Sequence, residues 1–518
     1  MKPFVTFSRR FIIGLFAFLM LAFLVTSFLS TARISQRETM DYGWDAWWLH
    51  MLVLAVAGGL LWLLAPRLEA MSRRAEMLLV VLCALAMLAF NAGIVLLSRS
   101  LPIFDQWHCW EMARQMAANY DPVWTYYYTN YFPHQMPYVL LLSLPMRLNP
   151  SPMWIQLLQA AGNVVGTWAL AECAALLSDR RSARLLTWLA ALSFLPFAFY
   201  TPFVYGNLPG LHAMLLAALG LMRYLTSGKK RHLLWMTLFM LLSCLLKQNM
   251  LIAAIAAAIV LCLWAMQQKR WLPVLTATVM IVLCATTGNV INHVVESRTD
   301  ANLSEGFPTS SWIMMGLSES EKEPGWYNEN SYTYYTEYGY SKATHDALSK
   351  ADIRQRLSDF AADPVHTLRF FGRKTLSQWN DPTFQSLWVN EMSRNPERSP
   401  LALSLYERGK VYRLVSWVMD ELHLLALAGI VLWVWLCRRE RNIAHLFFPL
   451  LLIGGFLFHL VWEAKGQYTF LYFFPLIAFG ALGWLEAALQ LGRREKPSAG
   501  DAAREQPEDA DSINTNAE

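Results

Sequence analysis

The sequence predicts an all-α polytopic membrane protein with about 12 transmembrane helices, and three observations lead to this fold class. First, 55% of the 518 residues are apolar and 16% are charged, whereas a soluble globular domain carries about 25% charged residues. Second, the apolar residues form long continuous runs without the periodicity of an amphipathic helix. Third, lysine and arginine gather between alternate runs. This composition excludes a disordered chain, a secreted disulfide scaffold and an ordinary cytosolic enzyme.

Each predicted span offers roughly the 20 apolar residues that a helix needs to cross the bilayer core. Backbone polar groups find no water in lipid, so each run is predicted to be helical. The first run is longer than the apolar part of a signal peptide, about 7–15 residues, which favours an uncleaved helix. The run 232–246 is short and could be tilted or half-buried. The twelve runs are 11–30, 46–65, 77–98, 152–177, 184–204, 208–226, 232–246, 249–267, 271–291, 416–437, 443–462 and 468–491.

The distribution of positive charge predicts the orientation of the chain. Lysine and arginine concentrate before the first run and after every second run, as at Arg9, Arg10, Lys229 and Lys230. Because cytoplasmic loops carry the excess of these residues, both termini are expected inside, an N-in/C-in topology in the plasma (inner) membrane. The segment 136–148 is apolar but too short to cross the membrane, and it is predicted to lie along the outer interface as an amphipathic helix. Membrane lipids are expected partners, and no nucleic acid is.

The predicted organisation follows from these spans. Two outer regions are large enough to carry a site, and the polar C-terminal end has the composition of a disordered tail. The segments are N-terminal transmembrane helices (1–98), an outer loop with interfacial helices (99–151), further transmembrane helices (152–291), a large extracytoplasmic loop or small α-rich subdomain (292–415), C-terminal transmembrane helices (416–491) and a disordered cytoplasmic tail (492–518).

The first outer loop holds two acidic candidates for catalysis. Asp105 lies just beyond the third span, where its carboxylate can accept a proton from a hydroxyl group at the membrane surface. The alternative is that Asp105 caps a short helix that begins at Gln106. Glu111 lies on that same predicted helix. It either contributes to the site or pairs with Arg114 three residues later.

Two lysines of the outer surface are candidates for binding a phosphate. Lys465 lies in the turn between the last two spans, and as a point charge it either contacts phosphate or extends to water beside a hairpin. Lys247 directly precedes a span, so the N–H groups of that helix could add to an anion site. Arg373 and Lys374 are weaker candidates of the same kind.

A divalent metal is left open as a cofactor, and no other cofactor is predicted. The isolated carboxylates of Asp105 and Glu111 could hold such an ion. No set of metal ligands with a recognisable spacing is visible in the sequence.

Three sequence landmarks appear in a familiar order. DQWHCWEMARQM follows an early span, YFPHQMPYVLLLSLP comes next, and EAKGQYTFLYFFPLIAFGALG resembles an E-x-x-x-R-Y motif before a final helix. Together they resemble the C-type integral-membrane glycosyltransferases that depend on polyprenyl-phosphate sugars. The similarity is to the bacterial branch related to protein O-mannosyltransferases and lipid A aminoarabinose transferases. This chain departs from the pattern at Gln106, where many relatives have a second acid, and at Gln467, where the arginine is usual. It also has two additional N-terminal spans.

The resemblance implies an activity on the outer face of the membrane. A hexosyl or pentosyl unit would pass, with inversion, from a polyprenyl-phosphate donor to an envelope glycan, lipid or protein acceptor. Asp105 would be the general base, with Glu111 as the second acid, and 99–151 would be the catalytic loop. Lys247, Lys465 and Gln467 would contact the donor phosphate. The substrate-binding candidates are His134, Tyr131, Glu463 and Tyr468.

Two other classes of function stay open on sequence grounds. A lipid-linked polysaccharide transporter or flippase would need a polar path through the bundle, and the spans contain few ionisable residues. A surface polysaccharide polymerase or ligase would rely on outer-loop arginine and histidine groups. Arg373, His345 and His366 are the residues that keep this second alternative open.

Overall fold

The computed structural model is mostly helical and describes residues 2–118, 127–393, 395–437 and 442–494. The predicted tail beyond residue 494 therefore lies outside the described residues. Within them, ten helical segments are long and apolar enough to cross a membrane. They are α1 (Lys2–Leu29), α2 (Trp47–Ala70), α3 (Arg73–Ser98), α7 (Pro152–Leu177), α10 (Asn207–Ser227), η2 with α12 (Gln248–Met250, Leu251–Gln268), α13 (Leu272–Glu296), α20 (Lys410–Leu436), η3 with α21 (Ile443–Leu446, Phe447–Val461), and α22, η4 and α23 (Gly466–Phe473, Phe474–Leu476, Ile477–Arg494).

Two of the twelve predicted spans are shorter than expected. The run 184–204 was predicted as one helix, but it divides into α8 (Ala183–Ser193) and α9 (Leu195–Phe199). Pro196 stands in the first turn of α9, where its ring cannot continue the hydrogen bonding of the preceding helix. The run 232–246 is α11 (Arg231–Leu246), an apolar helix of 16 residues.

Close helix packing fixes the bundle where α20 crosses α23. A Cβ atom on Gly483 would come within 1.9 Å of the Gly429 carbonyl oxygen, and one on Gly429 within 2.3 Å of the Gly480 oxygen. Only glycine permits this approach of two backbones, the device by which membrane helices gain contact area. Helix α22 continues through η4 into α23, so the close crossing of α20 and α23 also helps to position α22.

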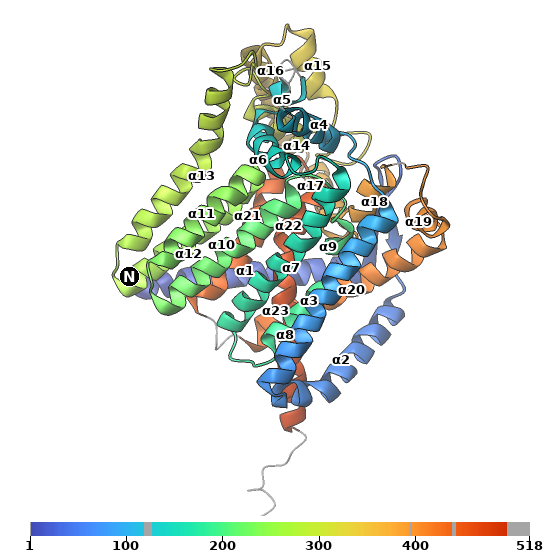
Figure 1. The fold of residues 1–518 in the computed structure, drawn as a ribbon, viewed down its shortest axis with the longest axis vertical. Coiled ribbons are helices and arrows are strands. Elements are labelled where there is room, and N and C mark those ends of the chain that lie inside the picture. Colours follow the sequence, from blue (N-terminus) through green and yellow to red (C-terminus); the bar gives the residue numbers. More distant parts are fainter. Residues whose placement is uncertain (1, 119–126, 394, 438–441, 495–518) are drawn as a thin grey trace, which may run out of the picture.

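Helices of the two outer loops, among them α4, α5, α14, α15 and α16, lie together at one end of the bundle (Figure 1). The segments 99–151 and 292–415 contain several shorter helices, and aromatic residues such as Phe307 and Trp379 join the same core cluster as the membrane helices. The large loop is therefore packed into the bundle. Its helices and those of the first loop are α4 (Asp105–Ala117), α5 (Tyr127–Tyr131), η1 (Pro133–Gln135), α6 (Met136–Met146), α14 (Thr309–Leu317), α15 (Asn330–Glu337), α16 (Lys342–Ala362), α17 (Pro364–Trp379), α18 (Ser386–Glu391) and α19 (Pro400–Tyr406).

One element departs from the all-α prediction. Strands β1 (Ser30–Ile34) and β2 (Met40–Trp44) form an antiparallel hairpin in which Ser30 pairs with Trp44 and Ile34 with Met40. The sequence prediction treated this segment only as an outer connection. The hairpin is anchored to the large loop, because the Ala32 N–H donates to the Asn380 carbonyl at 3.0 Å.

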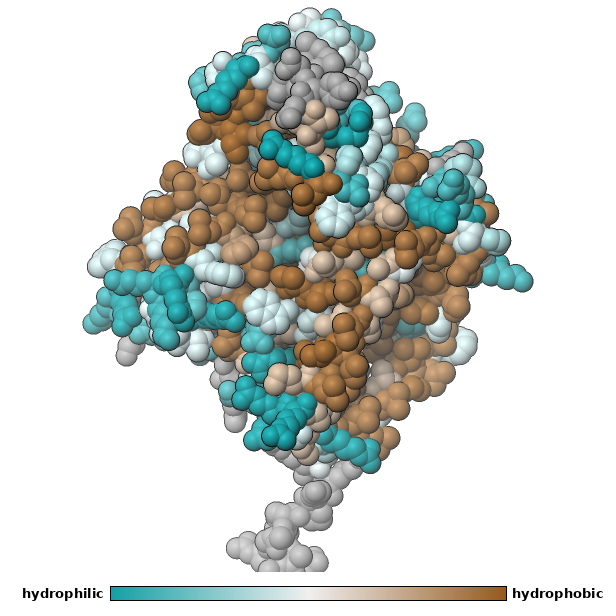
Figure 2. Space-filling model, in the orientation of Figure 1, coloured by the Kyte–Doolittle hydropathy of each residue, from teal (hydrophilic) through white to brown (hydrophobic). Residues whose placement is uncertain are grey.

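The surface of the bundle has the pattern expected of a protein in a bilayer. Figure 2 shows apolar side chains over the flanks of the bundle, between more hydrophilic ends. Helix α2 is typical of this surface, with Trp48 and Leu63 exposed by more than half. Such an apolar surface is unfavourable in water and is stable only against lipid.

Candidate functional site

A cavity of about 460 Å³ lies where the outer segments meet the helix bundle. This volume is in the usual range for pockets that bind small molecules, about 300–1,000 Å³. Seven of the nine sequence-predicted site residues line it: Asp105, His134, Lys247, Glu463, Lys465, Gln467 and Tyr468. They come from four separate segments of the chain, so the fold brings together residues that are far apart in sequence.

Asp105 is the first residue of α4 and is exposed to the cavity. Phe104, not Asp105, occupies the N-cap position, with φ 49° and ψ −132°. This backbone conformation is strained for a residue with a Cβ atom, and strain of about 1–3 kcal/mol is typical of functional sites. Desolvation raises the pKa of the Asp105 carboxyl, while nearby Lys465 opposes that rise. A raised pKa makes this carboxylate a stronger base than an aspartate in open water.

The two predicted phosphate-binding lysines occupy equivalent positions. Lys247 is the N-cap residue of η2, which leads into α12, and Lys465 is the N-cap residue of α22. Both have extended backbones, and both line the cavity. The cavity therefore receives two ammonium groups and the N-terminal ends of two helices, whose first N–H groups have no partner within their helix. Such an arrangement favours an anion.

The electrostatics of the two lysines differ. Lys247 lies over the rings of Tyr205 and Tyr468, 4.6 and 5.5 Å from their centroids. Burial lowers the pKa of Lys247 to about 8. The negative charge of Asp105 favours the protonated ammonium group and so opposes part of this shift. The pKa of Lys465 is raised above its ordinary value, because nearby carboxylates outweigh the effect of burial. Lys465 thus stays charged over a wider pH range than Lys247.

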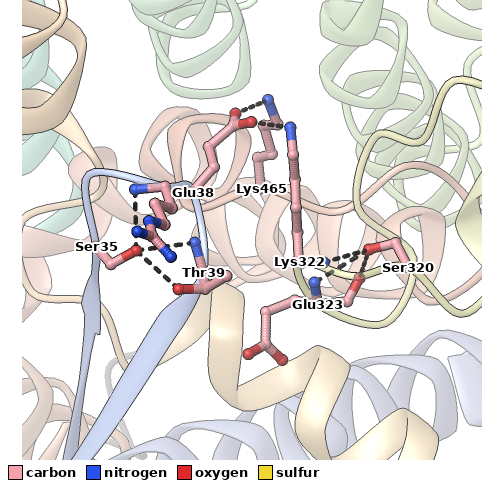
Figure 3. Close-up of polar contacts among 8 residues, drawn as sticks. Ser35, Glu38, Thr39, Ser320, Lys322, Glu323 and Lys465 are labelled. Atoms are coloured by element: carbon pink, nitrogen blue, oxygen red, sulfur yellow. Dashed lines mark hydrogen bonds and ion pairs between the residues drawn. The ribbon is translucent and has the colours of Figure 1, made fainter.

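The β1–β2 hairpin contributes a carboxylate that sequence reasoning missed. The Glu38 side chain lies between two lysines, as Figure 3 shows. Lys465 Nζ donates to Glu38 Oε1 at 2.7 Å, and Lys322 Nζ donates to the other oxygen of the same carboxylate. Glu38 and Lys322 both line the cavity, and so does Arg37. No local pattern marks them, because they come from a turn and an irregular loop.

Polar and aromatic groups complete the cavity wall. The Tyr468 hydroxyl donates to Glu463 Oε2 at 3.1 Å, and burial raises the pKa of Glu463. Burial lowers the pKa of His134 to about 4, so this imidazole is neutral near pH 7. Trp312 and Trp462 stack with their centroids 6.3 Å apart. These groups offer hydrogen bonds beside flat apolar faces.

The remaining two predicted site residues lie off the cavity wall. The Glu111 carboxylate accepts from Arg114 Nη2 at 2.6 Å and from Gln115 at 3.0 Å, which is the pairing alternative from sequence analysis. Glu111 is therefore engaged on the surface of α4 and does not form a pair with Asp105. Tyr131 stacks on Phe307 at 5.4 Å in the aromatic packing behind the wall.

The three residues that left a polysaccharide polymerase or ligase as an alternative function do not line this cavity. Arg373 pairs with Glu323 at 2.8 Å, and His345 is buried against aromatic rings. His366 lies 3.4 Å from Glu319 at the surface of the large loop. They do not converge on a common site with Asp105.

Lys374 positions the wall of the cavity without lining it. Its buried Nζ donates to the carbonyls of Leu460 and Trp462, each at 2.9 Å, and to that of Gly316. These bonds join α17 to the segment that carries Glu463 and Lys465. Gly316 belongs to the same junction, since a Cβ atom there would approach the Trp462 carbonyl carbon to 2.4 Å.

Lys374→Ala should destabilise the folded protein by about 3 kcal/mol, because buried carbonyl groups would lose their donor. The midpoint of thermal unfolding of the purified chain measures this effect. Lys350→Ala is the matched control, since Lys350 is exposed on α16 and pairs with Asp346. Superimposable melting curves for the two variants would contradict the structural role of Lys374.

The bundle of apolar helices defines a polytopic integral membrane protein with a charged cavity at one end. The family model described as "Conserved hypothetical integral membrane protein" matches residues 4–488. The chain belongs to this family, and it is a multi-pass membrane protein. No curated protein matches the sequence.

Among solved structures, the chain is similar to the arabinosyltransferase EmbB from Mycobacterium smegmatis, determined by single-particle cryo-EM. The sequences are 14% identical, and the similarity covers 88% of this chain and 46% of that chain, with a TM-score of 0.34. The chain therefore spans about half the length of EmbB. At this identity, no residue of one chain can be equated with a residue of the other.

Proposed function

We propose that this protein is a membrane glycosyltransferase that moves a sugar from a polyprenyl-phosphate donor to an envelope acceptor. The observation that carries the proposal is the convergence of Asp105, Lys247 and Lys465 on one cavity, beside the N-terminal ends of two helices. A base next to an anion site is what displacement of a phosphate leaving group requires. The resemblance of the three sequence landmarks to C-type glycosyltransferases points to the same reaction.

The reaction is a single displacement with inversion. The oxygen of an acceptor hydroxyl forms a bond to the anomeric carbon as the bond from that carbon to the phosphate oxygen breaks. The hydroxyl proton passes to the Asp105 carboxylate, and the electron pair of the broken bond leaves with the polyprenyl phosphate. Asp105 suits this role because desolvation raises its pKa and the side chain is exposed to the cavity.

The leaving phosphate gains negative charge as the bond breaks. Lys247 and Lys465 would stabilise that charge, and Gln467 in the first turn of α22 would add a neutral donor. Lys465 can do this while paired with Glu38, because an ammonium group has three donors. Lys322 supplies additional positive charge, which helps to offset the absence of an arginine at position 467.

The sugar and its acceptor would occupy the polar and aromatic part of the cavity. His134, Glu463 and Tyr468 offer hydrogen-bonding groups to sugar hydroxyls, and the stacked Trp312 and Trp462 offer flat apolar faces. The proposed acceptor is an envelope glycan, lipid or protein at the extracytoplasmic side of the plasma membrane. The apolar flank of the bundle would leave the polyprenyl chain in lipid.

The proposal is tested by the glycan composition of the envelope in cells. The gene is deleted and then restored as wild type or as Asp105→Asn. Loss of one sugar from the envelope, recovered with the wild type and not with Asp105→Asn, is the expected result. Full recovery with Asp105→Asn, at an equal protein level, would exclude Asp105 as the base and favour transport or polymerisation.

The pH dependence of kcat/KM should be bell-shaped. The acid limb reports protonation of Asp105 and should lie above the ordinary aspartate pKa of about 3.9. The alkaline limb reports loss of the proton from Lys247, whose pKa is about 8. Lys247→Arg should move the alkaline limb upward by more than about two pH units, because arginine stays charged. An alkaline limb that is identical in wild type and Lys247→Arg would contradict the assignment.

A further inference from the structure

A second cluster of charged side chains lies at the base of the β1–β2 hairpin. Asp45 directly follows β2, His50 lies in the first turn of α2, and Asp420 lies in α20. One donor atom from each of these residues lies within 4.8 Å of the other two. The Asp45 and His50 side chains are at most 9% exposed, and Asp420 is 4% exposed. Sequence spacing does not reveal this cluster, because Asp420 is remote in the chain.

The Asp45 and Asp420 carboxylates share one hydroxyl donor. Thr31 Oγ1 lies 2.6 Å from Asp45 Oδ2 and 2.9 Å from Asp420 Oδ2. The hydroxyl has a single proton and donates to only one of these oxygens at a time. Two buried carboxylate oxygens therefore converge on one donor, an arrangement that a bound cation would stabilise.

The imidazole of His50 is held with one nitrogen toward this pair. His50 Nδ1 lies 3.1 Å from both oxygens of Glu421. His50 Nε2 is buried and has no hydrogen-bond partner among the residues that the structure describes. Its distance to Asp45 Oδ2 is 3.9 Å, too long for a hydrogen bond. A histidine that bonds a carboxylate through one nitrogen and directs the other at acidic oxygens has the arrangement of a metal ligand.

We propose that Asp45, His50 and Asp420 bind a divalent metal ion, with Glu421 orienting the imidazole. One nitrogen and two carboxylate oxygens form a mixed ligand set that suits Zn²⁺ or a similar first-row cation better than Mg²⁺ or Ca²⁺, which favour oxygen alone. The ion neutralises the two aspartates and provides His50 Nε2 with its partner. This site is separate from the cavity and does not depend on the proposed function.

The metal would fix the hairpin relative to the bundle. Thr31 lies on β1 and Asp45 follows β2, so the site joins both strands to α20. The turn of the same hairpin carries Glu38, which pairs with Lys465 in the cavity. The ion therefore has a positioning role, and its loss should loosen a wall of the cavity.

The test is metal content and thermal unfolding of the full-length protein, purified in detergent without a chelator. Wild type should hold about one equivalent of Zn²⁺ per chain by mass spectrometry of the elements, and Zn²⁺ added after EDTA should restore its melting temperature. Asp45→Asn and Asp420→Asn should lose the metal, and Glu421→Gln should bind it about 10–100-fold more weakly. Asp41→Asn is the matched control, since Asp41 is exposed on β2.

A second measurement uses the wild type alone, so its result does not depend on whether the variants fold. Co²⁺ added to the metal-free wild type should give visible absorption bands that saturate at one equivalent and that Zn²⁺ abolishes. Metal content in wild type no higher than in Asp45→Asn would overturn the proposal. So would the absence of a saturable Co²⁺ spectrum, or an equal Zn²⁺-dependent rise in melting temperature in wild type and Asp420→Asn.

Discussion

Asp105→Asn should lower kcat for glycosyl transfer by about 10²–10⁴-fold, the usual contribution of a general base. The amide has nearly the same shape as the carboxylate. It cannot take the proton of the acceptor hydroxyl. The KM for the donor should change much less than kcat, because the lysines that contact the phosphate are untouched. Initial rates with the purified wild type and variant measure both constants.

Glu111→Gln is the control for this experiment. Glu111 lies on the same helix as Asp105 and carries the same charge, but Arg114 and Gln115 engage its carboxylate on the helix surface. Its removal should change kcat by less than about threefold, because the pair lies off the cavity wall and a partly exposed ion pair contributes about 1 kcal/mol or less to stability. A rate for Asp105→Asn equal to that of Glu111→Gln would rule out Asp105 as the base.

Lys465→Gln should lower kcat by about 10²–10³-fold, the loss expected when one stabilising group for a developing anion is removed. Lys465 is the N-cap residue of α22, so its ammonium group and the helix end would act on the same phosphate. Glu38 keeps its ion pair with Lys322 in this variant, so its carboxylate is not left alone.

Two further variants separate charge from folding in the Lys465 experiment. Lys465→Arg keeps the charge and should recover at least about tenfold of the lost rate. Lys350→Gln removes a lysine from the exposed surface of α16 and should have no effect on kcat. If Lys465→Gln keeps more than half of the wild-type rate, the phosphate is bound elsewhere.

The sequence predicted the membrane architecture well because its physical cause is local. A run of about 20 apolar residues can cross lipid without help from distant parts of the chain, and ten of the twelve predicted runs lie in helical segments that are long and apolar enough to do so. The exceptions also have local causes. Pro196 interrupts the run 184–204, which the sequence analysis treats as one span on its apolar composition alone.

The cavity was only partly predictable. The sequence predicts Asp105, Lys247 and Lys465 as site residues because each is ionisable and lies next to a span, where an ionisable residue is a candidate for a functional role. All three line the cavity. Glu38 and Lys322 were missed, since their proximity to Lys465 depends on the hairpin and on the packing of a large loop. Those contacts are tertiary, and no spacing in one sequence reports them.

Buried polar groups within the predicted spans also make tertiary contacts that the sequence does not predict. Asn163 Nδ2 donates to Asn91 Oδ1 at 3.0 Å, and Thr201 Oγ1 donates to that same oxygen at 2.8 Å. His212 Nε2 lies 2.8 Å from Asn163 Oδ1. In the sequence these residues are isolated, whereas in the fold they satisfy one another and join three helices. A network whose members bond to each other stabilises a bundle and does not form an open path for a polar solute.

The most direct test of the central claim is the fate of the lipid donor. Purified protein in nanodiscs is incubated with an envelope acceptor and a lipid extract from cells that lack the gene, and the lipids are followed by mass spectrometry. Wild type and Glu111→Gln should consume one polyprenyl-phosphate sugar and release polyprenyl phosphate, while Asp105→Asn should leave that donor intact. An unchanged donor in the wild-type reaction, or equal consumption by Asp105→Asn, would contradict the account.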